Sequence, residues 1–114
     1  MLRLATVLTL VLAAGSVHAA SLCNGSVYER GLCAYRGGNF DEAVKLFRLV
    51  IEAAEQSPPT LKSHYFLARS LMKQKKWSEA ASELIRIYGL SRAFYDEWNC
   101  DFLLGECRRA QGLE

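Results

Sequence analysis

The sequence has 114 residues, of which 51% are hydrophobic and 23% are charged, and its formal net charge is +2. This length accommodates one domain, and the composition is that of an ordinary globular protein, which excludes a disordered chain. A charge this close to neutral gives no reason to expect nucleic acid as a partner.

The first 19 residues have the pattern of a secretory signal peptide of bacterial type. One early cation, Arg3, is followed by an uncharged apolar run from Leu4 to Ala14 and then by small residues. The run has about 11 residues, fewer than the roughly 20 that span a bilayer. Because Val17 and Ala19 suit signal peptidase, we expect cleavage after Ala19 and a mature chain of residues 20–114 that is periplasmic or secreted.

Two alternatives remain open for this N-terminal segment. The first is an anchor that is not cleaved and stays in the membrane. The second is a lipoprotein acylated at Cys23, which Leu22 disfavours because a lipobox needs a small residue directly before its cysteine. If cleavage occurs, we expect no membrane span in the mature chain.

Residue types recur along the mature chain at an interval of 37 residues, which predicts a repeat protein. One set of three small residues and one set of three aromatic residues have this spacing, and so do four further pairs of similar residues. The recurring sets are Gly31/Ala68/Gly105, Tyr28/Tyr65/Phe102, Phe40/Trp77, Glu42/Glu79, Ala43/Ala80 and Phe47/Leu84.

Each unit is predicted to consist of a helix, a tight turn and a second helix. In the first unit, residues 28–36 have helical spacing and Gly37-Gly38-Asn39 interrupts it with residues that tolerate positive φ. Apolar residues resume helical spacing over 41–55, and Pro58-Pro59 then separates the first unit from the second.

The second unit repeats this pattern over residues 61–91, with its turn at Gln74-Lys75-Lys76. The third unit is half as long. It is predicted to contain one helix, from about Glu97 to Gln111, which ends at Gly112.

These units resemble the tetratricopeptide repeat (TPR) at Gly31, residues 38–43 and Phe47, and again at Ala68, residues 77–80 and Leu84, with Leu104-Gly105 opening the third. The resemblance implies an all-α fold, a short TPR-type α-solenoid of antiparallel helix pairs with about five helices. Its units are expected at about 24–57, 61–94 and 98–112. The small residues at 31, 68 and 105 are expected to let neighbouring helices approach closely. The TPR unit has about 34 residues rather than 37, and the sel1-like repeat is the alternative family.

The resemblance also implies that the first helix of each unit lines a concave groove that binds another protein, as a peptide segment or a helix. Aromatic side chains provide contact area there, and cations attract acidic segments. The alternative is that these aromatic residues only pack helix against helix. The expected groove residues are Tyr28, Tyr35, Arg36, Tyr65, Arg69, Met72, Lys73, Phe102 and Arg109.

The sequence contains no pattern that predicts catalysis or a cofactor. His64, the one histidine after residue 19, stands at a core-type position, where a buried and hydrogen-bonded histidine is the expected outcome. No nucleophile with its base, phosphate-binding loop or metal-ligand cluster can be assembled, so we expect neither an enzyme nor a metal or other cofactor.

Four cysteines follow the predicted cleavage site, and an even number in an exported small protein favours disulfides. Cys100 and Cys107 stand seven residues apart on one predicted helix, about 10.5 Å along its axis, which exceeds the roughly 7 Å that a disulfide allows. Cys23 can bond to Cys33 only if the segment before Tyr28 folds back on the first helix. The alternative is that some thiols stay free or bond to a partner.

The sequence therefore predicts a binding module, an adaptor or assembly factor for a bacterial envelope machine. The alternative is a structural subunit held in a permanent oligomer, including a homo-oligomer, through the last helix. Because that helix has no second-helix partner in the sequence, we expect Trp98, Leu103 and Leu104 to be partly exposed.

Overall fold

The structure is a computed structural model that describes residues 23–53 and 58–113. The predicted signal peptide and its cleavage site lie outside these residues, and so does the end of the first unit. The described residues form six helices: α2 (Val27–Arg36), α3 (Phe40–Ala53), α4 (Pro58–Lys73), α5 (Trp77–Leu90), α6 (Arg92–Glu97) and α7 (Cys100–Gln111).

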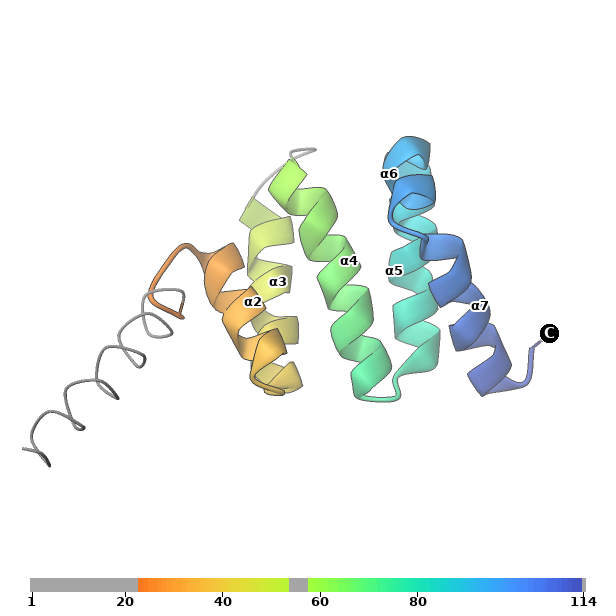
Figure 1. Ribbon diagram of the computed structural model, residues 1–114, viewed down its shortest axis with the longest axis horizontal. Helices are drawn as coiled ribbons and strands as arrows, with labels where there is room; N and C mark the ends of the chain where they lie inside the picture. The colour runs from red at the N-terminus through yellow and green to blue at the C-terminus, as the bar shows by residue number, and fades with distance from the viewer. Residues whose placement is uncertain (1–22, 54–57, 114) are drawn as a thin grey trace, which may run out of the picture.

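The helices form antiparallel pairs that stack side by side in chain order (Figure 1). The pair α2/α3 packs against α4, which pairs with α5, and α7 then packs against α5. This confirms the predicted all-α architecture of stacked helix pairs. The sequence predicted about five helices, and the described residues contain a sixth, the short α6, between the second unit and the last helix.

Helix α2 begins where Ser26 and Glu29 form a capping box. The backbone N–H of Glu29 donates to Ser26 Oγ at 3.2 Å, and the backbone N–H of Ser26 donates to the Glu29 carboxylate at 3.3 Å. This turn brings the preceding residues back onto the helix, so that the Cα atoms of Cys23 and Cys33 lie 5.3 Å apart and the disulfide between them is present. The fold-back that the sequence left open does occur.

Turns at equivalent repeat positions contain a residue with positive φ. These are Gly38 at φ 80°, Lys75 at φ 61° and Gly112 at φ 72°, each 37 residues from the next. Glycine adopts this conformation freely, whereas the Cβ of Lys75 makes it unfavourable. The turn predicted at residues 74–76 is confirmed, and Lys75 is the residue that adopts the left-handed conformation.

The start of the last helix differs from the prediction. Ser91 caps α6 by accepting a hydrogen bond from the N–H of Phe94 at 3.1 Å, and α6 ends at Glu97. Asn99 then takes a left-handed conformation with φ 54°, so α7 begins at Cys100 rather than at Glu97. Asparagine tolerates that conformation better than most residues, and it redirects the chain between the two helices.

Of the three residues expected to be partly exposed, Trp98 is half-buried as expected, whereas the expectation was wrong for Leu103 and Leu104. Both are buried together with Cys100 and Cys107, which have no exposed surface. These four residues lie at positions i, i+3, i+4 and i+7 and form the apolar stripe of α7. The two cysteines are free thiols that serve as core residues, and α5 covers this side of the helix.

Candidate functional site

A groove with a volume of about 430 Å³ separates α4 from α7. Two successive turns of α4 form one wall, and the first turns of α7 form the other. The groove is lined by Tyr65, Arg69, Met72, Lys73, Trp77, Trp98, Asn99, Phe102, Leu103 and Glu106.

Five of the residues that the sequence singled out for a groove line this one, namely Tyr65, Arg69, Met72, Lys73 and Phe102. They come from the predicted first helices of the second and third units. These residues lie around one groove because α7 packs against α5 and α6, and α7 therefore faces α4 across the groove.

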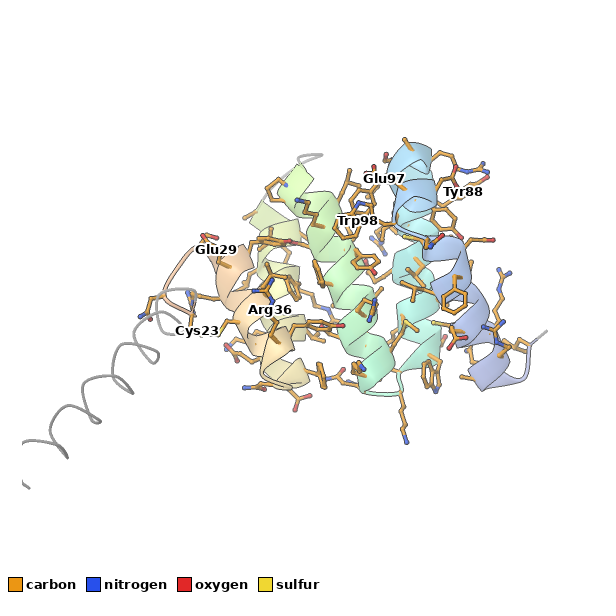
Figure 2. All side chains as sticks on the ribbon, viewed as in Figure 1. Cys23, Glu29, Arg36, Tyr88, Glu97 and Trp98 are labelled. Atoms are coloured by element: carbon orange, nitrogen blue, oxygen red, sulfur yellow. A yellow bond between two sulfur atoms is a disulfide. The ribbon has the colours of Figure 1, made fainter. Side chains whose placement is uncertain are left out.

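The other four predicted groove residues lie elsewhere. Tyr28 lines a separate apolar cavity of about 350 Å³ between α2, α3 and the start of α4. Tyr35 packs edge-on against Phe66 of α4, with ring centroids 5.5 Å apart. Arg36 is exposed on α2, far along the array from α7 (Figure 2). Arg109 forms an exposed ion pair with Glu106.

Trp98 lines the groove although it is not among the predicted groove residues. It lies between α4 and α6 (Figure 2), where its ring contacts Tyr65 edge-on at 4.9 Å and stacks on Phe94 at 4.8 Å. Phe94 and Trp98 are four residues apart, and Ser91 stands three before Phe94, so a capped helical turn could have been recognised there. Because the last helix was expected to begin at Glu97, this turn was not seen.

Arg69 is held in the groove wall by neutral phenols. Its guanidinium donates to Tyr65 Oη at 2.9 Å. Burial lowers the pKa of Arg69, but this hydrogen bond and the phenol of Tyr35 outweigh burial, and the pKa is raised overall. The side chain is therefore a fixed cation at all relevant pH values.

The two walls of the groove differ in charge. Arg69 and Lys73 both stand on α4, and among the residues that the structure describes no carboxylate forms an ion pair with either. On α7, Glu106 is paired with Arg109, so its charge is largely offset. Phe102 presents an aromatic ring that is 64% exposed beside this pair. The groove thus has a basic wall on α4 and an apolar wall on α7.

His64 lies outside the groove and has a structural partner. It is buried in α4, and its Nδ1 lies 2.7 Å from a carboxylate oxygen of Glu83 in α5. Within residues 23–53 and 58–113, no three His, Cys, Asp or Glu side chains gather as a metal ion would require. In the same part of the chain, no helix combines the length and apolar character needed to cross a bilayer.

Residues 9–87, more than half of the chain, match the family model described as anaphase-promoting complex, cyclosome, subunit 3 (ANAPC3). The match begins within the predicted signal peptide and ends in α5. No catalytic family was found. Searches of curated proteins and of solved structures gave no match. The helix pairs and the family match together confirm the TPR resemblance, and the chain belongs to the ANAPC3 family as a TPR-like helical repeat protein, a protein–protein interaction module.

Proposed function

We propose that this chain is a non-enzymatic adaptor or assembly factor that holds one component of a bacterial envelope machine in the groove between α4 and α7. The observation that carries the proposal is the groove itself, in which exposed aromatic surface lies beside two cations with no carboxylate partner among the described residues. Such a combination of aromatic residues and arginine is typical of the residues that dominate binding energy at protein interfaces.

Two further observations support the adaptor role. The family is described as a subunit of a multiprotein complex, which favours a component of an assembly over a free-standing protein. Export is supported by the sequence of residues 1–19, whose apolar run and small final residues are those of a signal peptide. An exported helical repeat with a protein-binding groove fits an envelope assembly.

The groove also explains an apolar exposure that is otherwise costly. Phe102 is 64% exposed although an aromatic ring gains about 1.5–3 kcal/mol from full burial. Its neighbours Leu103 and Leu104 are buried in the core, so α7 is anchored by apolar residues other than Phe102. A partner segment that covers Phe102 would recover this burial.

The proposal is tested by replacing Tyr65 and Arg69 together with alanine and measuring partner capture from envelope extracts. The chain offers a matched control in Tyr88 and Arg92, which are also four residues apart and also joined by an arginine-to-phenol hydrogen bond, of 2.8 Å. Both residues are exposed and neither lines the groove, and Figure 2 shows Tyr88 on the side of the array away from α4.

We expect the Tyr65/Arg69 variant to lose partner capture while its helical circular dichroism stays nearly unchanged. The Tyr88/Arg92 variant should capture the partner normally. Equal capture by both variants would show that the groove is not the binding surface, and loss of helicity in the first variant would show that Tyr65 and Arg69 serve packing instead.

The second candidate function is a structural subunit locked in a permanent oligomer through the last helix. It is favoured by one observation, the exposure of Phe102 and Leu113 at 64% and 62% along and beyond α7. Light scattering separates the two functions, because a fixed oligomer across dilution supports the subunit and a monomer supports the adaptor.

A further inference from the structure

We propose that the groove between α4 and α7 selects an extended acidic segment of its partner, in which two acidic side chains flank one large apolar side chain. This inference rests on the proposed function, since it names the partner chemistry of the same groove. It follows from three features: the spacing of the cations, the way Arg69 is oriented, and the difference between the two walls.

The orientation of Arg69 is set before any partner arrives. One guanidinium nitrogen donates to Tyr65 Oη at 2.9 Å, and the Tyr65 ring is itself held edge-on against Trp98 at 4.9 Å. The phenols of Tyr65 and Tyr35 interact with the guanidinium without neutralising its charge, so the donors that they do not engage remain available for a carboxylate. A fixed arginine loses less side-chain entropy on binding than a mobile one.

The spacing of the cations favours an extended segment. Arg69 and Lys73 are four residues apart on α4, about 6 Å along the helix axis. Alternate residues of an extended chain point to the same side and stand about 6.6 Å apart. Acidic residues separated by one position therefore match the two cations.

The α7 wall of the groove accounts for the apolar residue between the two acidic residues of the segment. In an extended chain the middle side chain points away from its two neighbours, toward α7 if the acids face α4. There Phe102, Leu103 and the ring of Trp98 offer apolar contact, and the charge of Glu106 is offset by Arg109. The groove thus matches the alternation acidic, apolar, acidic.

Four synthetic dodecapeptides with a fluorescent label test this specificity by anisotropy. Their central residues are Asp-Leu-Asp, Asn-Leu-Asn, Lys-Leu-Lys and Leu-Asp-Asp in an otherwise uncharged Gly/Ser sequence. We expect Asp-Leu-Asp to bind about tenfold more tightly than Asn-Leu-Asn at low salt, as two partly exposed ion pairs imply. Leu-Asp-Asp should bind more weakly because its acids are adjacent, and about 0.5 M salt should remove most of the preference.

Protein variants identify the residues responsible. The double variant Arg69→Gln/Lys73→Gln should bind Asp-Leu-Asp and Asn-Leu-Asn equally, and Arg69→Glu/Lys73→Glu should prefer Lys-Leu-Lys. The matched control is Lys75→Gln/Lys76→Gln, which removes the same charge from the exposed turn outside the groove and should keep the tenfold preference.

Equal binding of Asp-Leu-Asp and Asn-Leu-Asn by the unmodified protein, or no binding of either, would overturn the inference. A single-stranded oligonucleotide that bound as tightly as Asp-Leu-Asp would also overturn it, by showing that the cations read phosphate. Neither result would touch the proposed function if partner capture still depended on Tyr65 and Arg69. Failure of that capture experiment would instead remove the proposed function.

Discussion

Gly31 of α2 lies directly against the ring of Phe47 in α3, so closely that a Cβ atom at Gly31 would stand 2.8 Å from Cε1 of that ring. Phe47 has no exposed surface and is stacked on Phe66 of α4 at 5.8 Å, so the ring has little room to move away. The absence of a side chain at Gly31 therefore sets the distance between α2 and α3.

Replacing Gly31 with alanine is expected to lower the free energy of unfolding by about 1–3 kcal/mol, because the added methyl group overpacks a full core. The control is Gly105→Ala at the equivalent repeat position. A Cβ there meets only the end of the Arg109 side chain at 3.4 Å, so this variant should be neutral or gain up to about 1 kcal/mol of helix propensity. Urea denaturation measures the free energy of unfolding of both variants, and equal changes in the two would contradict the role given to Gly31.

Lys75→Gly is expected to stabilise the protein. The backbone at Lys75 has φ 61°, a conformation that is unfavourable for any residue with a Cβ and that glycine adopts at the equivalent Gly38 and Gly112. We expect a gain of about 1 kcal/mol in the free energy of unfolding. Lys76, the N-cap residue of α5, has φ −91°, so Lys76→Gly should bring no gain. Thermal melting compares the two, and a destabilised Lys75→Gly variant would show that the turn is not strained.

Glu83→Ala is expected to cost about 1–3 kcal/mol of stability, because it leaves the buried His64 without its hydrogen-bond partner. Glu52→Ala, at an exposed position on α3, should change stability by less than about 0.5 kcal/mol. A double-mutant cycle with His64→Ala measures the coupling between the two side chains. A coupling energy near zero would mean that the 2.7 Å contact between α4 and α5 adds nothing to stability.

Stability is expected to fall at alkaline pH. Burial raises the pKa of the Cys100 thiol to about 11, and burial together with the hydrogen bond to Asp101 raises the pKa of Tyr95 to about 12. Both groups are neutral when protonated, and each has a higher pKa in the folded than in the unfolded state. The native state therefore holds these protons more tightly, and its stability is complete below about pH 9 and declines as the pH rises through 11.

Urea denaturation between pH 7 and pH 11 measures this decline, and Cys100→Ala should make it shallower by removing one of the groups. The same experiment checks the core role of the thiol, because alkylating reagents attack only the thiolate of an accessible cysteine. Cys100 and Cys107 should remain unmodified at pH 8 until the protein unfolds. Rapid alkylation of the native protein would show that α7 is not packed as described.

The repeat could be predicted from the sequence because helix pairing depends on features that the chain shows directly. Small residues such as Gly31 and Ala68, 37 residues apart, mark close helix contacts, and the residues at 37–39 and 74–76 mark turns. The third small residue, Gly105, follows the same spacing and yet is half-exposed, and a Cβ there would meet only the end of the Arg109 side chain. Spacing alone thus identifies equivalent positions but not whether a neighbour is present.

The sequence was enough to predict some of the residues that line the groove. Tyr65, Arg69, Met72 and Lys73 share one face of α4, and a 3.6-residue period is enough to place them together. Phe102 joins them because repeat spacing places it at the position of Tyr65. Tyr28 holds the equivalent position in the first unit, but α2 packs directly against α3 and α4, and that closeness leaves it lining a different cavity.

By itself, the sequence of this protein determined the helix pairs, the turns between them and the basic face of α4, since each depends on residues close together in the chain. The tertiary structure decided whether the chain before α2 folds back to join Cys23 to Cys33, and whether α7 buries Leu103 and Leu104. It also decided that the break at Asn99 places Trp98 between α4 and α6. These outcomes depend on contacts between segments distant in the chain, whose packing free energies no local pattern contains.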